Sequence, residues 1–202
     1  MHDLLVVGGG VTGLSLAVHG ARAGLAIVLA ETGGLGGVST QRSGALVRTH
    51  YADAGSARLA LGGLQHFEAF AERYGGPAGF VATGFAYVPG EAERADGSFG
   101  ERVRMQWSIG VRTELLAAAA RADGVDLRPY TRVERLLCGG DGALTQGGRA
   151  IGAASTVLCA GAWSAGLAAG AGVTLCCGWS GPGFETGPSV GAALAPWIAR
   201  PH

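Results

Sequence analysis

Residues 3–31 decide the fold, and they read DLLVVGGGVTGLSLAVHGARAGLAIVLAE. The apolar run at 3–7 predicts a short strand that is buried on both faces of a parallel sheet. Small and apolar side chains recur on one face over 11–24, which predicts a helix. A second apolar strand is expected at 25–30, directly before Glu31. A strand, a helix and a strand within about 30 residues form a β-α-β unit, so the sequence predicts an α/β fold.

The turn after the first strand is a G-x-G-x-x-G motif. Gly8 permits a tight turn, Gly10 lets a diphosphate approach the backbone, and Gly13 lets the helix pack on the strand. The N-terminus of the helix adds free N–H donors and a partial positive charge. A carboxylate at the end of the second strand can accept both hydroxyls of an adenosine ribose. We therefore predict dinucleotide binding by five residues: Gly8, Gly10, Val11, Gly13 and Glu31. The alternative is a glycine-rich turn beside a solvated carboxylate.

The composition excludes several classes of protein. Of the 202 residues, 48% are hydrophobic and 15% are charged, which supports a sizeable core and argues against disorder. Fifteen basic residues balance fifteen acidic ones, so the chain lacks the positive surface that binds nucleic acid or an acidic membrane. Every basic residue is an arginine, which excludes a pyridoxal Schiff base and a P-loop lysine. We expect neither nucleic acid nor a membrane as a partner.

One stretch resembles a membrane span in its length alone. Ala150 to Phe184 carries no charged residue and is long enough to cross a bilayer. Its many glycines and hydroxyl residues favour an interior strand followed by a packed helix. We also expect no secretory leader, because the glycines begin at Gly8, too early for an apolar leader core. The cysteines lack zinc-site spacing, so we expect reduced thiols, no metal and a cytoplasmic location.

Further elements are expected along the rest of the chain. The glycines of 33–37 predict a loop. Helices are expected at 55–74, 110–122, 163–169 and 188–199, the last opened by Pro188. Strands are expected at 79–88 and 156–160, with three short strands over 127–158 separated by glycine turns.

Three places in the sequence carry a family resemblance. They are the nucleotide-binding unit at 3–31, the loop GLGGVSTQRSGALVRTHY at 34–51, and AASTVLCAGAWSAGL at 153–167 taken with GWSGPGFETGPSVGAALAPWI at 178–198. Together they resemble FAD-dependent amine oxidoreductases of the glycine oxidase, D-amino acid oxidase and sarcosine oxidase type. The resemblance implies a Rossmann-like FAD-binding domain with a three-stranded insert, and a reduced α+β substrate domain. The first domain would comprise residues 1–50, 127–172 and 176–202, and the second residues 51–126.

The resemblance also implies where FAD lies. The diphosphate and flavin would lie along Ser39, Thr40, Arg42 and Ser43, and the adenine would lie beside Val133. The cofactor would be covered by Ala160, Gly161 and Trp163. The flavin carbonyl would lie near Gly183 and Phe184. Some relatives attach flavin covalently through a histidine at the position of Arg42, so the FAD here is expected to be non-covalent.

Two residues are candidates for the catalytic side. Arg48 falls where related enzymes use an arginine for the substrate carboxylate, a task suited to a planar two-donor fork. The alternative for Arg48 is an ordinary surface arginine. His50, next to Tyr51, is a candidate polar group lining the site.

The chain also departs from the family. Members are roughly twice as long, which is beyond one compact core. The block expected between Gly172–Leu175 and Cys176–Trp179 is absent, which would leave sheet edges unpaired and the flavin open. Pro182 stands where relatives often have histidine. Glu185 stands where some have lysine, and an acid there disfavours a carboxylate substrate.

Three functions follow as hypotheses. The first is an enzyme that transfers hydride from the CH–NH group of an amino acid or secondary amine to flavin N5. The second is a non-catalytic FAD- or dinucleotide-binding module, or one completed by a second subunit or by a homo-oligomer. The third is a nicotinamide-dependent dehydrogenase, which rests on the glycine motif alone. The sequence leaves open the substrate, the electron acceptor and the oligomeric state.

Overall fold

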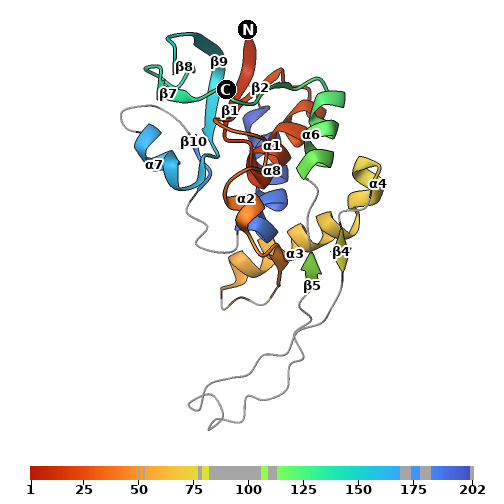
Figure 1. Ribbon diagram of the computed structural model, residues 1–202. Helices are drawn as coiled ribbons and strands as arrows, with labels where there is room; N and C mark the ends of the chain where they lie inside the picture. The colour runs from red at the N-terminus through yellow and green to blue at the C-terminus, as the bar shows by residue number, and fades with distance from the viewer. Residues whose placement is uncertain are drawn as a thin grey trace, which may run out of the picture.

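The computed structural model describes residues 1–49, 51, 53–76, 79–81, 106–108, 113–168, 174–177 and 183–200. One large sheet organises the chain, with strand order β6-β2-β1-β9-β8-β7 and with β10 also paired to β9 (Figure 1). Its strands are β1 (His2–Val7), β2 (Ile27–Ala30), β6 (Asp126–Arg128), β7 (Val133–Leu136), β8 (Gly142–Thr145), β9 (Ala150–Leu158) and β10 (Thr174–Leu175).

The predicted β-α-β unit is confirmed. Helix α1 (Val11–Arg22) connects β1 to β2, and the two strands pair in parallel with Leu4 opposite Ile27. On its other side β1 pairs in parallel with β9, and β2 pairs with β6. The first strand therefore lies in the centre of the sheet, which explains its continuous apolar sequence.

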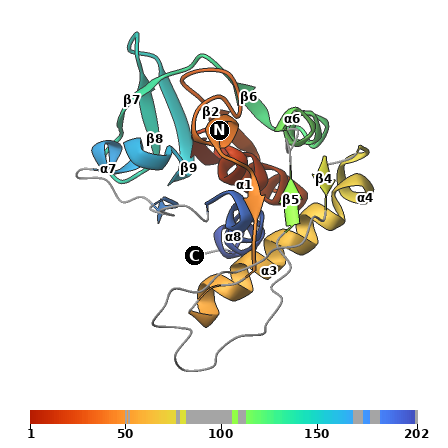
Figure 2. The ribbon, with the colours of Figure 1, turned by 60° about the horizontal axis from the view of Figure 1, so that its bottom comes forward.

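Alternate residues of β1 face two different hydrophobic clusters. Leu4 and Val6 point toward a layer that includes α1, α6 (Thr113–Ala122) and α8 (Gly183–Ile198). Leu5 and Val7 point toward the antiparallel strands β7, β8 and β9. The antiparallel strands continue the sheet through β9, and Figure 2 shows them with the short helix α7 (Ser164–Leu167) on the other side of the parallel strands from the long helices. The parallel strand β1 is therefore covered on both faces.

Helices α1 and α8 pack closely because small residues lie between them. A Cβ atom placed on Gly191 of α8 would lie 2.6 Å from the backbone nitrogen of Leu16 in α1. No side chain fits into that space, so α8 is held directly against the helix that begins at the glycine turn.

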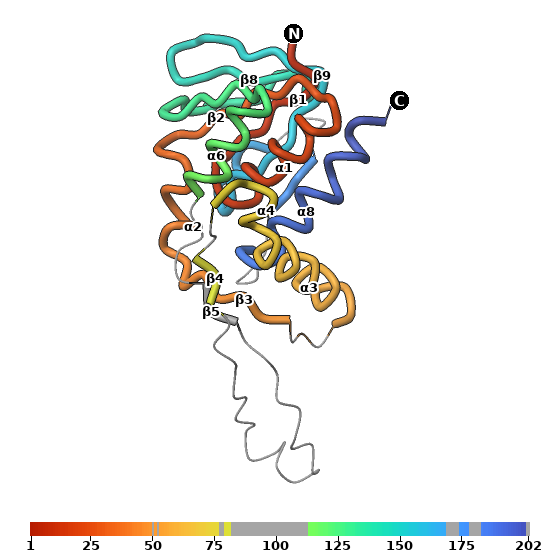
Figure 3. Tube along the Cα trace, turned by 90° about the vertical axis from the view of Figure 1, so that its right-hand side faces the viewer, coloured from red at the N-terminus to blue at the C-terminus, as the bar shows by residue number. Residues whose placement is uncertain are grey.

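Beyond α1 and α8 lies a smaller unit, seen in the lower part of Figure 3. It contains α3 (Ala54–Glu68), α4 (Phe70–Tyr74) and a second sheet of order β3-β5-β4. The strands of this sheet are β3 (Leu46–Val47), β4 (Phe80–Val81) and β5 (Gln106–Ser108). Phe67 and Phe70 are fully buried and join this unit to the main core.

The helix predicted at 55–74 is present but divided at Ala69. Asp53 caps its start by accepting a hydrogen bond from the Ser56 N–H at 2.7 Å. Gly75 ends it in a left-handed conformation with φ +75°, as expected of a glycine at this position. The expected helix at 110–122 is α6, which the structure describes from Thr113.

The prediction for the last helix was wrong at its start. Helix α8 begins at Gly183, so Pro188 lies inside it and does not open it. The first turn is held by burial, since Phe184, Glu185 and Thr186 are all buried. Because Gly63 has no side chain, α3 can approach the carbonyl of Glu185, where a Cβ would lie 1.5 Å away.

The three-stranded insert is present as the antiparallel strands β7, β8 and β9. Its third strand and the expected closing strand are one continuous element, because β9 runs on to Leu158 and there pairs with β1. The segment near Leu127 is a separate strand, β6, of the parallel sheet. The strand predicted at 79–88 is described only over 80–81, and the remainder lies outside the described residues.

Smaller differences concern single elements and side chains. The helix expected at 163–169 is a 3₁₀ turn, η1 (Gly161–Trp163), followed by α7. His66 of α3 is 4% exposed, whereas Trp197, near the end of α8, is 49% exposed. Among the described residues, no helix combines the length and apolar character needed to cross a membrane.

Candidate functional site

The glycine turn, residues 8–13, lies at the carboxyl ends of β1 and β9. Gly8 has φ +113°, and a Cβ there would lie 2.4 Å from the Cys159 carbonyl oxygen. A Cβ on Gly13 would lie 1.9 Å from the Gly8 carbonyl oxygen. Neither position can carry a side chain, so the start of α1 packs directly on the strand ends, as the motif predicted.

The beginning of α1 presents backbone N–H groups. Gly10 precedes the first turn of α1, and because glycine has no side chain it cannot cap the helix. The Val11 N–H donates to the Thr40 hydroxyl at 3.0 Å, which brings two of the predicted cofactor residues together. Thr40 belongs to α2 (Ser39–Arg42), a short helix that the sequence did not predict. A twelve-residue helix beginning here concentrates positive potential at the turn.

Glu31 faces the glycine turn from the end of β2. One carboxylate oxygen accepts from the Gly9 N–H at 2.7 Å, and the other accepts from the Gly33 N–H at 2.8 Å. A carboxylate oxygen has two acceptor sites, so both can take a further hydroxyl donor. The half-buried Glu31 side chain therefore stands where a ribose next to the turn would meet it.

The loop after β6 completes this side. Thr131 donates its backbone N–H to the Glu31 carbonyl at 2.7 Å, and Tyr130 donates to the Gly33 carbonyl at 3.0 Å. Val133 follows as the first residue of β7 and is buried in the insert cluster. The glycine turn, the segment after β2 and the loop after β6 thus meet beside Glu31.

The other predicted cofactor residues in this part of the structure come from two segments, 39–43 and 160–163. Gly161 and Ser39 come together, since a Cβ on Gly161 would lie 4.0 Å from the Ser39 hydroxyl oxygen. Trp163 is 61% exposed, so its ring lies at the surface. Arg42 is exposed as well. The Ser43 hydroxyl accepts from the Ala45 N–H at 3.0 Å and thereby fixes the entry to β3.

Phe184 contributes to the core through its side chain. Its ring stacks on Phe67 with centroids 5.5 Å apart and an interplanar angle of 12°. Because that ring packs in the core, only the backbone groups of Gly183 and Phe184 are available at the N-terminus of α8. His50 lies outside the described residues. The described part of the chain contains no group of three or more residues able to ligate a metal.

Arg48, Tyr51 and Glu185 form a hydrogen-bonded group that we call the polar triad. The Tyr51 hydroxyl donates to Oε1 of Glu185, and Nε of Arg48 donates to the Tyr51 hydroxyl oxygen at 3.2 Å. Arg48 also stacks over the Tyr51 ring, with its guanidinium carbon 4.8 Å from the ring centroid. Nε of Arg48 lies 3.9 Å from the carboxylate of Glu185. Sequence reasoning named Arg48 but missed Tyr51 as its partner.

Burial sets the charges of the polar triad. Burial raises the pKa of Glu185, an effect that the hydrogen bond from Tyr51 and the nearby Arg48 oppose. Burial and the bond to Glu185 raise the pKa of Tyr51 to about 12. The bond to Tyr51 raises the pKa of Arg48. The Glu185 side chain is 5% exposed and that of Arg48 is 49% exposed, so solvent molecules reach the cation and not the carboxylate.

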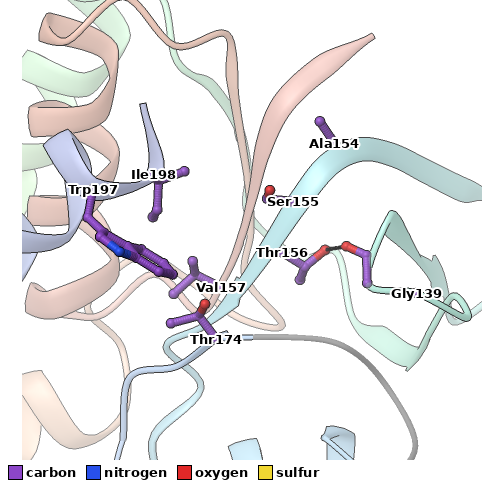
Figure 4. A pocket seen from close by; sticks show the side chains of 9 residues that line it. Gly139, Ala154, Ser155, Thr156, Val157, Thr174, Trp197 and Ile198 are labelled. Atoms are coloured by element: carbon purple, nitrogen blue, oxygen red, sulfur yellow. Dashed lines mark hydrogen bonds between the residues drawn. The ribbon is translucent and has the colours of Figure 1, made fainter. Parts of the chain in front are cut away.

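A separate pocket of about 140 Å³ lies between β9 and the end of α8 (Figure 4). It is lined by Gly139, Gly140, Ala154, Ser155, Thr156, Val157, Thr174, Trp197 and Ile198. None of these residues belongs to the glycine turn or to the polar triad. The pocket is therefore no part of the candidate site.

Comparisons with known proteins identify the family and the fold. The family described as "FAD dependent oxidoreductase" (DAO) matches residues 3–116. L-amino acid deaminase from Proteus vulgaris has a similar structure, with a TM-score of 0.67 and 19% identity over 81% of this chain and 48% of the deaminase. No curated protein sequence matches significantly.

Two further solved structures extend the comparison. L-proline dehydrogenase from P. horikoshii gives a TM-score of 0.67 at 22% identity, over 83% of this chain and 55% of the other. Glycine oxidase from Geobacillus kaustophilus gives 0.65 at 23% identity, over 84% and 58%. These likenesses confirm the predicted Rossmann-like α/β fold. The chain spans about half the length of the solved proteins it matches.

Proposed function

Because this chain belongs to the family of FAD-dependent oxidoreductases, we propose that it binds FAD non-covalently and serves to oxidise the CH–NH group of an amino acid or secondary amine. The observation that carries the proposal is the glycine turn with Glu31 beside it. This arrangement offers backbone donors for a diphosphate and a carboxylate for the adjoining ribose.

The residues around the turn fit FAD. Gly8 and Gly13 let α1 begin directly on the strand ends, Gly10 places no side chain over the backbone N–H groups of the turn, and Glu31 keeps acceptor capacity toward a ribose. Ser39, Thr40 and Gly161 lie together on the adjacent side. Arg42 stands where covalent attachment would need a histidine. The bound flavin would supply the electron acceptor.

The polar triad supplies the proposed contact with substrate. The Tyr51 hydroxyl holds Nε of Arg48, and a guanidinium carries four further N–H donors. These donors suit a substrate carboxylate that approaches the half-exposed Arg48 from solvent. Glu185 orients Tyr51 from its buried position at the start of α8, and its negative charge weakens the attraction of Arg48 for anions. We therefore expect a substrate that carries both an amine and a carboxylate to bind better than a dicarboxylate.

A second function is favoured by the length of the chain. The chain covers 48% of the Proteus vulgaris deaminase, which is about half of that protein. The alternative proposal is therefore an FAD-binding module that acts only with a completing subunit or a second copy of itself.

The test is a visible spectrum followed by an anaerobic titration. The protein is purified with FAD supplied and then mixed with glycine, sarcosine, L-proline or D-alanine in the absence of oxygen. Yellow protein whose flavin absorbance falls with one of these compounds supports the enzyme. Yellow protein that responds only after a second chain is added supports the module. Colourless protein, with no FAD bound at micromolar concentration, contradicts both proposals.

A further inference from the structure

Two cysteines outside the proposed catalytic chemistry lie side by side in the large sheet. Cys159 follows the last residue of β9, and Cys176 follows the last residue of β10. The two strands are parallel, with Leu175 opposite Leu158, and the Cys176 N–H donates to the Leu158 carbonyl at 2.8 Å. The cysteines are therefore neighbours across adjacent strands, although 17 positions (176 − 159) separate them in the sequence.

Both thiols face the same buried environment. Cys159 is 9% exposed and Cys176 is 3% exposed, and both belong to the hydrophobic cluster on the helix side of the sheet. Their side chains form a hydrogen bond with each other. Adjacent strands lie about 4.8 Å apart, which falls within the Cα separation that a disulfide accepts, about 4.4–6.8 Å. The strands thus place the two cysteines at a backbone separation that a disulfide can span.

The two thiols differ in acidity. The hydrogen bond from Cys159 lowers the pKa of Cys176, because it stabilises the thiolate. The same bond, together with burial, raises the pKa of Cys159. The bond thus favours one thiolate beside one thiol, which is the state in which the pair can react with an oxidant.

We propose that Cys159 and Cys176 are a redox-active pair that forms a reversible disulfide when it meets hydrogen peroxide. One sulfur of the pair, as its thiolate, attacks one peroxide oxygen and the O–O bond breaks, which gives a sulfenic acid and a hydroxide ion; the hydroxide takes up the proton that the thiol had released and becomes water. The second sulfur then attacks the sulfur of that sulfenic acid, and its proton leaves with the hydroxyl as a second water. Two thiols are oxidised to one disulfide, and one peroxide is reduced to two waters.

The disulfide would join two parts of the molecule. Cys159 lies next to the glycine turn, since its carbonyl oxygen would be 2.4 Å from a Cβ on Gly8. Cys176 lies on the segment that precedes α8 in the chain. The link would fasten β10 covalently to the sheet that carries the proposed nucleotide site.

Peptide mapping of the full chain tests the pair. The reduced protein is treated with hydrogen peroxide, alkylated while unfolded and digested with chymotrypsin, because no arginine lies between Arg149 and Arg200 while Trp163 separates the two cysteines. We expect a Cys159–Cys176 cross-link that dithiothreitol removes. We also expect the thermal midpoint to rise by roughly 5–10 °C on oxidation, because the link constrains the unfolded chain.

Two variants serve as matched controls. Cys138→Ser removes an exposed cysteine, and Cys177→Ser removes the neighbour of Cys176. Both should retain the cross-link and the rise in midpoint, whereas Cys176→Ala should lose both. A link from Cys159 to Cys177, or no intramolecular link in the folded wild-type chain, would overturn the proposal. An unchanged midpoint with the link present would overturn the fastening role.

Discussion

The glycine turn and the polar triad depend on different parts of the chain. The turn uses backbone groups of residues 8–13, together with Glu31 and Thr40, which all come from the first fifth of the sequence. The polar triad joins side chains that are 134 positions apart, Tyr51 and Glu185. The glycine turn acts through backbone groups, so it should tolerate many side-chain changes nearby but no added bulk at its glycines. The polar triad acts through side chains, so it should depend on each of its hydroxyl and carboxylate groups.

The largest expected effect comes from added bulk in the turn. We expect Gly13→Val to cost roughly 4 kcal/mol or more of folding free energy and to abolish FAD binding, because the new Cβ would lie 1.9 Å from the Gly8 carbonyl oxygen. Thermal unfolding and FAD fluorescence titration measure these losses. Gly166→Ala is the control, since its Cβ would meet nothing within 4 Å. Normal FAD affinity in Gly13→Val would show that the turn does not hold the diphosphate.

Acid should destabilise the packing between α1 and α3, the two helices that support the glycine turn and the polar triad. His66 of α3 is buried beside His19 of α1, with ring centroids 5.7 Å apart, and its Nε2 lies 3.1 Å from the Tyr74 hydroxyl. Burial first, then His19, Arg73 and Arg22, lower the pKa of His66 to about 3. The stabilisation is therefore complete above pH 6.5, the ordinary pKa, and is lost as pH falls toward 3.

Between pH 8 and pH 5, this histidine should lower the free energy of unfolding by about 2 kcal/mol. Urea unfolding at both pH values measures the loss. His66→Gln should flatten the dependence by that amount. An equal pH dependence in His66→Gln and wild type would contradict this account.

A smaller effect is expected from one hydroxyl of the polar triad. Tyr51→Phe removes the hydrogen bond to the buried Glu185, so we expect a loss of about 1.5 kcal/mol in stability with FAD affinity unchanged. Tyr130→Phe is the matched control, because Tyr130 is 80% exposed. Urea unfolding and FAD titration measure the two quantities. If Tyr51→Phe weakened FAD binding tenfold, the turn and the polar triad would not be independent.

The smallest effect concerns the hydroxyl at the start of α1. Thr40→Val removes the acceptor of the Val11 N–H, and we expect a cost of about 1 kcal/mol, or a fall of roughly 2–4 °C in the thermal midpoint. Thr40→Ser keeps the hydroxyl and should restore the wild-type midpoint. A full loss in Thr40→Ser would mean that the methyl group, and not the hydrogen bond, stabilises the helix.

Sequence reasoning succeeded where the structure is local. The apolar runs before Gly8 and before Glu31 predicted buried parallel strands, and Gly75 predicted the end of a helix. It failed at Pro188, because a rule about proline at helix starts says nothing about the burial that holds Phe184 and Glu185 in helical geometry. The neighbouring sequence also gives no sign that His66 is buried, because that burial comes from the packing of α1, α3 and α4 around it.

The sequence by itself determined the β-α-β unit, the glycine turn and the acid at the end of the second strand. Each of these depends on the size, polarity and spacing of residues within about 30 positions, which a single chain records directly. Only the tertiary structure decided that Tyr51 joins Arg48 to Glu185 and that Cys159 meets Cys176. Such contacts depend on the paths of strands and helices between distant residues, and those paths follow from packing of the whole core.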